Sequence, residues 1–287
     1  MLRERTVPAE AVAAPAAPIR KVAWTGRVFA KTIRDQRRAL RWWILGVIAV
    51  PLMYLAVWPT MRENAASFDD MFRRMPDVFR NLVGDDFTTP AGYLRAELFA
   101  FLGPILLVVA AIGAGARATA ADERGGTLDL LLSGPVRRRS VLIHKAGAML
   151  AVLTLLTGTM AITVIALGPV FGLNLDVSNL IAMTTHLLLF ALAFGMVALA
   201  AGAATGRRGA AVGVTGGLAV LSFVLYTVAP SIAVLEPLRV ASPYFFYLGH
   251  NPIVRGAHWG DLAVLASIAA AALAFAIVTF ERRDLAT

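Results

Sequence analysis

The segment AGAMLAVLTLLTGTMAITVIALGPV, from Ala146 to Val170, contains 25 residues and no charged side chain. At 1.5 Å per residue, a helix of this length crosses the ~30 Å hydrocarbon layer of a bilayer. A second uncharged run of equal length extends from Leu180 to Ala204. Two such runs predict a chain that is folded by membrane-spanning helices.

The composition of the whole chain agrees with this prediction. Its 287 residues are 58% hydrophobic and 16% charged, with a mean hydropathy of +0.70, which lies outside the range of ordinary soluble proteins. Four further apolar segments are long enough to span: Trp42–Trp58, with Pro51 in its interior, Leu98–Ala116, Gly209–Ala229 and Leu262–Phe280. Because the segments are too long and too uniformly apolar for alternating barrel strands, we predict an all-α polytopic membrane protein with six transmembrane helices.

The distribution of basic residues predicts the orientation. With the N-terminus inside, the inner connections and tails hold 20 Lys and Arg, and the outer connections hold 7. Short loops rich in Lys and Arg stay on the cytoplasmic side. Both termini are therefore expected in the cytoplasm. The chain has no cysteine, which excludes disulfides and thiolate metal sites.

The segment before the first span divides into two parts. Residues 1–18 are rich in Ala and Pro and lack the apolar core of a secretory signal, so we expect a disordered cytoplasmic tail. Residues 19–41 place Val22, Phe29 and Ile33 on one helical face and most basic residues off it, which predicts an amphipathic helix on the inner leaflet. A basic face that only binds anionic lipid is the alternative interpretation.

One polar loop separates the second and third spans on the predicted cytoplasmic side: ADERGGTLDLLLSGPVRRRS, Ala121 to Ser140. We expect Thr127 to cap a short helix that ends at Pro135. Leu128, Leu131 and Leu132 would then form one apolar face beside a run of arginines. An exposed leucine face favours a protein partner, although packing against the chain's own basic helix is the alternative.

The motifs of this loop resemble the coupling-helix signature of bacterial ABC-2 type transporter permeases. The matching residues are Asp122-Glu123, Gly126-Thr127-Leu128, Leu131-Leu132, Pro135-Val136, Arg138 or Arg139, Ser140 and Lys145. Other parts of the chain resemble the family in the same order: Thr89–Leu94 with Glu97, Ser242-Pro243-Tyr244 with Asn251-Pro252, and Phe280 with Arg282–Leu285.

The resemblance implies a function. It implies a multi-pass permease subunit in a bacterial cytoplasmic membrane that pairs with a second permease and rests on separate ATP-binding subunits. Residues 42–287 would form the six-span domain, residues 19–41 the connecting helix, and residues 121–136 the coupling helix. The residues expected to contact the ATP-binding subunit are Glu123, Thr127, Leu128, Leu131, Leu132, Pro135, Arg138 and Arg139.

The expected division of labour leaves no enzymatic role to this chain. The sequence contains no Gly-x-x-x-x-Gly-Lys-Ser/Thr motif, so ATP and Mg²⁺ are expected in the partner, and no catalytic residue is assigned here. The partners implied are an ATP-binding subunit, a second permease and membrane lipid, without nucleic acid. The predicted function is outward movement of an amphipathic, drug-like or lipid-like substrate. A membrane-remodelling or maturation complex, or a secondary transporter, remains the alternative.

Within the membrane, the resemblance implies a dimer interface and substrate path along the second and fifth spans. The candidates for the path are Phe101, Leu102, Ile105, Phe223 and Tyr226, and ordinary helix packing is the alternative role for them. Gly209, Gly213 and Gly217 form one small-residue face, which predicts tight packing within the subunit or across a dimer.

The histidines give weaker signals. His186 is the titratable group well inside a span, and we expect a packing role for it because no carboxylate partner is evident from the sequence. His250 and His258 stand eight residues apart in a loop, a spacing that gives no reason to expect a metal site.

Overall fold

The computed structural model describes residues 22–67, 71, 74–76, 86–124 and 138–282. Six helices within these ranges are long and apolar enough to cross a membrane. The described residues form helices and connecting turns without a strand, which confirms the predicted all-α fold. The predicted tail at residues 1–18 and most of the predicted coupling helix lie outside the described residues.

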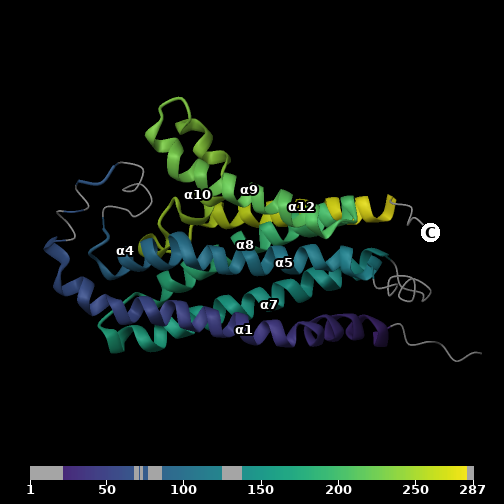
Figure 1. The fold of residues 1–287 in the computed structure, drawn as a ribbon, viewed down its shortest axis with the longest axis horizontal. Helices are drawn as coiled ribbons and strands as arrows, with labels where there is room; N and C mark the ends of the chain where they lie inside the picture. The colour runs from purple at the N-terminus through teal and green to yellow at the C-terminus, as the bar shows by residue number, and fades with distance from the viewer. Residues whose placement is uncertain (1–21, 68–70, 72–73, 77–85, 125–137, 283–287) are drawn as a thin grey trace, which may run out of the picture.

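The long helices agree with the predicted spans, and several begin earlier than predicted. They are α1 (Val22–Glu63), α5 (Gly103–Arg124) with the short helices before it, α7 (Arg138–Leu167), α8 (Val177–Thr205), α9 (Arg208–Val228) and α12 (Trp259–Arg282). The first and last described residues of the bundle lie at the same end (Figure 1), as an even number of spans requires.

Helix α1 joins two segments that the sequence analysis treated separately. The expected connecting helix and the first span form one continuous helix of 42 residues, which passes through Pro51 and Pro59 without a break. Val47 and Leu55 are buried on its inner face, whereas Trp42 is 74% exposed. The boundary predicted at residue 41 is therefore not the end of a helix.

Helix α8 is the centre of the bundle. Of its most apolar window, 72% is buried, compared with 22% for α1 and α12, and it packs against α5, α7, α9 and α12. The approach of α5 to α8 depends on glycine, because a Cβ at Gly115 would overlap the backbone of Gly195. A Cβ at Gly195 would in turn lie 2.7 Å from the sulfur of Met149. Small residues at these positions allow the two helix backbones to touch.

The second span begins with three consecutive helical pieces. Thr89 caps α4 (Pro90–Leu94), because its hydroxyl oxygen accepts a hydrogen bond of 3.0 Å from the Gly92 amide. A π-helix follows over Arg95–Leu102 and leads into α5 at Gly103. The span thus begins eight residues before the predicted Leu98, although Arg95 and Glu97 are polar.

Short helices connect the long ones at the same end as α4. A 3-10 helix (Gly168–Phe171) precedes α8, and two more (Ala229–Ser231 and Glu236–Ala241) follow α9. The segment between α9 and α10 (Pro243–Leu248) extends away from the bundle (Figure 1). The helix α11 (Pro252–Arg255) then leads to α12. The distribution of basic residues predicts that this end lies on the outer side of the membrane.

Candidate functional site

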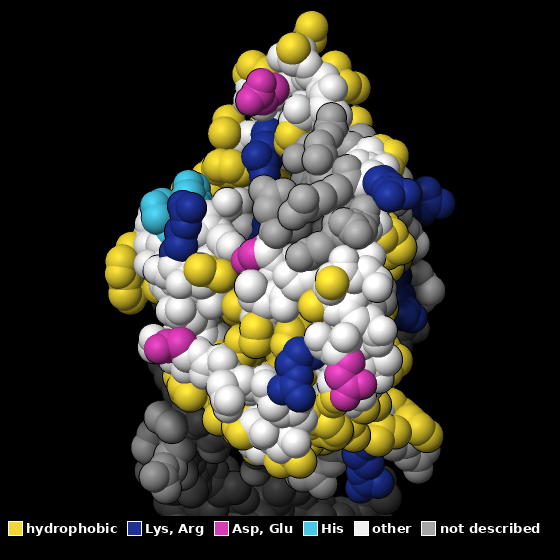
Figure 2. Space-filling model, turned by 90° about the vertical axis from the view of Figure 1, so that its left-hand side faces the viewer, with side chains coloured by type: hydrophobic (Ala, Val, Ile, Leu, Met, Phe, Trp, Pro, Cys, Tyr) yellow, Lys and Arg dark blue, Asp and Glu magenta, His cyan; other side chains and the backbone are white. Residues whose placement is uncertain are grey.

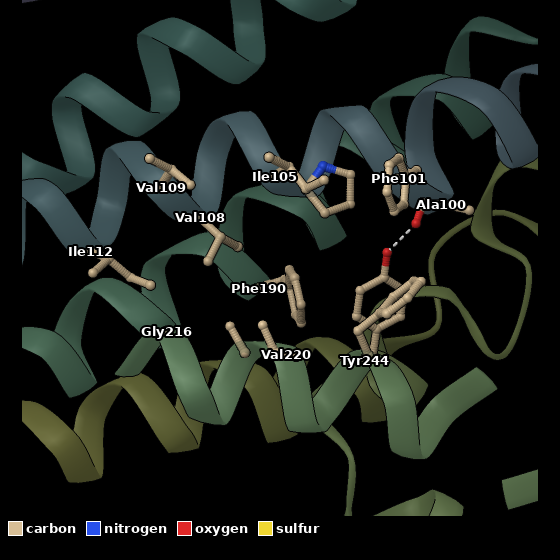
Figure 3. A pocket seen from close by; sticks show the side chains of 13 residues that line it. Ala100, Phe101, Ile105, Val108, Val109, Ile112, Phe190, Gly216, Val220 and Tyr244 are labelled. Carbon is tan, nitrogen blue, oxygen red and sulfur yellow. Dashed lines mark hydrogen bonds between the residues drawn. The ribbon is translucent and has the colours of Figure 1, made fainter. Parts of the chain in front are cut away.

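An apolar cavity of about 370 Å³ lies between the second span and α9. Phe190 of α8 and Tyr244 of α10 contribute to its lining between these two walls (Figure 3). None of the lining residues is charged: Ala100, Phe101, Pro104, Ile105, Val108, Val109, Ile112, Phe190, Gly216, Ala219, Val220, Phe223 and Tyr244. Such a site suits an apolar molecule or the apolar part of an amphipathic one.

The cavity is open on one side of the bundle. Phe101, Ile105 and Val109 recur every four residues along the second span, and their side chains are each about half exposed. On the other wall, Val220 is 64% exposed and Phe223 is half-buried. A ligand could therefore enter from the membrane as well as along the bundle, and a second protein surface could complete the open side.

Aromatic rings close the end of the cavity near α10. The ring of Tyr244 lies 5.2 Å from that of Phe190 and 5.5 Å from that of Phe223, in edge-to-face geometry. Phe223 also meets Phe101 across the cavity at 5.9 Å between ring centroids. Because aromatic pairs favour these arrangements, the cluster sets the separation between the second span and α9.

The position of Tyr244 follows from a proline in the second span. Pro104 has no N–H, so it cannot donate a hydrogen bond to the carbonyl of Ala100, four residues earlier. The Tyr244 hydroxyl donates to that carbonyl instead (Figure 3). Next to it, the Tyr247 hydroxyl donates to the Phe99 carbonyl at 2.7 Å. Two tyrosine hydroxyls of α10 thereby donate hydrogen bonds to carbonyls that the π-helix and Pro104 leave without a backbone donor.

Burial keeps these two tyrosines protonated. Both side chains are buried, and desolvation, followed by the nearby tyrosines, raises the pKa of Tyr244 and of Tyr247 well above the ordinary value. The hydroxyls therefore remain hydrogen-bond donors at any pH at which the protein is folded. The α10 segment is fixed to the second span by neutral contacts.

Of the five residues predicted for the substrate path, three line the cavity and two do not. Phe101, Ile105 and Phe223 line the cavity. Leu102 does not line it, because it lies on another side of the π-helix. Tyr226 is 1% exposed and belongs to the core, where its hydroxyl lies 3.4 Å from Nη2 of Arg95 and its ring lies under Arg239. A packing role describes Tyr226 better than a path role.

The glycines of α9 make no close packing within the described part of the subunit. Apart from the neighbouring residues and the backbone of α9 itself, no atom of the described residues lies within 4 Å of the position that a Cβ would take at Gly209, Gly213 or Gly217. Tight packing within the subunit occurs instead at Gly115 and Gly195. For the α9 glycines, packing across a dimer therefore remains as the structural alternative.

The predicted coupling residues fall mainly outside the described part of the chain. Thr127, Leu128, Leu131, Leu132 and Pro135 lie within residues 125–137. Glu123 is in the last turn of α5 and Arg138 begins α7, while Arg139 is exposed. The two helix ends that flank the loop are joined, because Lys145 of α7 donates a hydrogen bond to the carbonyl of Ala118 in α5.

The structure brings together histidines that are distant in sequence. His250 and His258 meet at the carboxylate of Asp261, at the start of α12. His186 of α8 is completely buried beside them. This cluster was not predicted from the sequence, because Asp261 belongs to none of the motifs discussed above. The presence of two histidines in one short loop was the one feature of the sequence that pointed to the cluster.

Comparison with known proteins identifies a protein family whose model matches this chain. A family model described as ABC-2 family transporter protein matches residues 27–285. A search of curated proteins finds no match to the chain. The matched range includes all six candidate membrane spans, the cavity and the histidine cluster.

Proposed function

Because the chain belongs to the family of ABC-2 transporter proteins, we propose that it is the permease subunit of an ATP-driven exporter in a bacterial cytoplasmic membrane. As a member of this family, it is a multi-pass transport subunit and not itself an enzyme. The proposed substrate is amphipathic, drug-like or lipid-like, and it is moved outward.

The observation that carries this proposal is the apolar cavity between the second span and α9. Its uncharged lining offers no ring of charges for a small ion and no set of acids for proton coupling. Its open side gives access from the bilayer, where an amphipathic molecule concentrates. Chemistry and access therefore both favour a lipid-like substrate over a hydrophilic one.

A second permease subunit is proposed to close the open side of the cavity. Helix α9 exposes apolar residues over much of its length, including Val214, Val220 and Leu221, each more than half exposed. The open space at Gly213 and Gly217 permits close approach of another helix. Two copies that meet along α9 and the second span would enclose one shared path.

Energy is proposed to come from ATP and Mg²⁺ bound to a separate ATP-binding subunit. The partner would engage the loop between α5 and α7, at the end of the bundle where the described chain begins and ends. Lys145 joins α7 to the last turns of α5, so a force on this loop would move both helices together. The second span, which α5 continues, also forms one wall of the cavity.

The test compares two phenylalanines of matched chemistry. In the reconstituted complex with a verified transported compound, Phe223→Ala should reduce stimulation of ATPase activity by the compound and leave the basal rate near normal. Phe275→Ala is the control, because Phe275 of α12 is 57% exposed and does not line the cavity. Equal stimulation in the Phe223→Ala complex and the wild type would contradict the path. ATP turnover without movement of any compound would favour a remodelling complex.

A further inference from the structure

A cluster of two histidines and one aspartate lies at the outer end of the bundle, apart from the cavity. His250 Nδ1 lies 2.7 Å from Oδ2 of Asp261, and His258 Nδ1 lies 3.1 Å from Oδ1 of the same carboxylate. One possible ligand atom from each residue lies within 4.8 Å of the other two. Histidine side chains gather on the surface of this end (Figure 2). Three side chains with metal-binding chemistry thus converge on one point.

The surrounding backbone holds these side chains in place. Asn251 and Gly256 adopt positive φ angles of 52° and 80°, which turn the chain on either side of α11. Asn179 of α8 fixes the intervening turn, because its amide nitrogen donates to the Val254 carbonyl at 2.9 Å. The His258 carbonyl accepts from the Asp261 amide at 3.1 Å and so begins α12. The cluster is thus built from the two turns that flank α11 and from the first turn of α12.

A third histidine, His186 of α8, lies beside the cluster. Its Nδ1 lies 2.9 Å from the Ala182 carbonyl. Its Nε2 is buried and makes no hydrogen bond of good geometry among the residues that the structure describes, although the backbone of His258 lies nearby.

The surroundings of His186 connect it to the cluster. Asp261 and the backbone and ring of His258 lie close enough to His186 to interact with it electrostatically. His186 therefore packs against the cluster from α8, and the residues whose possible ligand atoms converge are His250, His258 and Asp261.

We propose that His250, His258 and Asp261 bind one divalent transition-metal ion of the zinc class, with water as the fourth ligand. Two imidazoles and one carboxylate suit Zn²⁺ and Co²⁺, whereas Ca²⁺ and Mg²⁺ prefer oxygen ligands. Two ligand atoms on a tetrahedral ion with 2.0–2.1 Å bonds lie about 3.3 Å apart. The nitrogen–oxygen distances of 2.7 and 3.1 Å are close to that value, so the ion would replace the protons that now join each histidine to the carboxylate.

Binding requires the histidine rings to tilt. The rings of His250 and His258 stack at 4.2 Å with 15° between their planes, and one ion cannot lie in both planes while they are parallel. Their side chains are 38% and 51% exposed, which gives them room to rotate and gives the ion a route from outside. Asp261, 3% exposed, is the fixed ligand. The bound ion would fasten the loop before α12 to the first turn of α12.

The competing explanation is a hydrogen-bonded cluster that holds the loop without metal. Titration of the full-length permease with Co²⁺, followed by displacement with Zn²⁺, separates the two explanations. The protein is purified in detergent with an affinity tag that contains no histidine, and metal is first removed with a chelator. We expect one Co²⁺ per chain with the visible absorption of a tetrahedral site, and loss of that absorption when one equivalent of Zn²⁺ is added.

Variants locate the site. His250→Ala and His258→Ala change exposed side chains, and each should weaken Zn²⁺ binding by about 100-fold or more, beyond the 10–100-fold effect of an outer-shell group. His144→Ala is the control, because the side chain of His144 bonds within its own helix, at 2.6 Å from the Ser140 carbonyl.

Circular dichroism and gel filtration of every variant show whether it is folded. Should a histidine variant fail to fold, Asp261→Asn provides the second test, because the amide keeps the size of the carboxylate and loses its charge. Weaker metal binding by folded Asp261→Asn supports the site. Binding below one equivalent in the wild type, or equal Zn²⁺ affinity in the wild type, His258→Ala and Asp261→Asn, would overturn the proposal.

Discussion

Replacement of Tyr244 by Phe tests how the cavity end is built. The change removes the hydroxyl that donates to the Ala100 carbonyl and keeps the ring that lines the cavity. Ala100 is completely buried, and Pro104 cannot supply the missing donor. An unsatisfied buried carbonyl costs about 1–3 kcal/mol, so we expect Tyr244→Phe to lower the free energy of unfolding by that amount.

The physical reason is tested by a second change in the same pair. Pro104→Ala restores an N–H to the second span, and this N–H can bond to the carbonyl that Tyr244 loses. In that background Tyr244→Phe should cost only the net value of a typical hydrogen bond, about 0.5–1.5 kcal/mol, or less. The two changes should therefore be non-additive by about 0.5–1.5 kcal/mol.

A matched tyrosine provides the control. The Tyr93 hydroxyl donates at 3.0 Å to the Tyr54 carbonyl in α1, which Pro104 does not affect. Tyr93→Phe and Pro104→Ala should be additive. The assay is reversible unfolding of the permease in mixed micelles with increasing denaturing detergent. An equal cost of Tyr244→Phe in both backgrounds, within about 0.5 kcal/mol, would refute the explanation.

Three further predictions concern packing, pH and orientation. Gly115→Ala should destabilise the bundle by about 1–3 kcal/mol in the same unfolding assay, because the added Cβ would overlap the backbone of Gly195. Gly158→Ala is the control: the position has open space around it, so the change should be neutral or stabilising by up to about 1 kcal/mol. Hydrogen bonds from Ser178 and Asn179 lower the pKa of Asp176 below its ordinary value of 3.8. The carboxylate therefore contributes its full stabilisation of α8 above pH 3.8, and this stabilisation is lost as the pH falls through the lowered pKa. Asp176→Asn should remove this acid-dependent loss of stability in the unfolding assay. Single cysteines at positions 176 and 250 should react with an impermeant thiol reagent in intact cells, and one at position 207 should not; the reverse pattern would contradict the orientation.

The number and type of the spans could be predicted because burial in lipid depends on side-chain hydrophobicity, which the sequence displays directly. The start of the second span could not be predicted in the same way. Arg95 and Glu97 suggested a loop, but Thr89 and Pro90 begin a helix there and Arg95 is buried against Tyr226. Tertiary contacts outweighed the local polarity of these residues.

The candidate site was predictable only in part. Phe101, Ile105 and Phe223, which line the cavity, were candidates because the family resemblance implied a path along the second and fifth spans and because their side chains are apolar. Tyr226 looked the same in sequence, yet its side chain turns to the core. Glycine spacing on α9 did not reveal a packing partner, since the contact of Gly115 with Gly195 joins two helices far apart in sequence. Asp261 and His250 are likewise joined only by the turns at Asn251 and Gly256.

The central claim is that this permease depends on a separate ATP-binding subunit that holds the loop between α5 and α7. Affinity purification from the native membrane tests it most directly, with Leu131→Asp in the loop and Leu238→Asp in the outer 3-10 helix as the matched control. The account predicts that an ATP-binding protein is recovered in about equal amount with the wild type and with Leu238→Asp, and is lost from Leu131→Asp. Recovery of the wild-type permease without any ATP-binding protein, or equal recovery of that protein with Leu131→Asp, would contradict it.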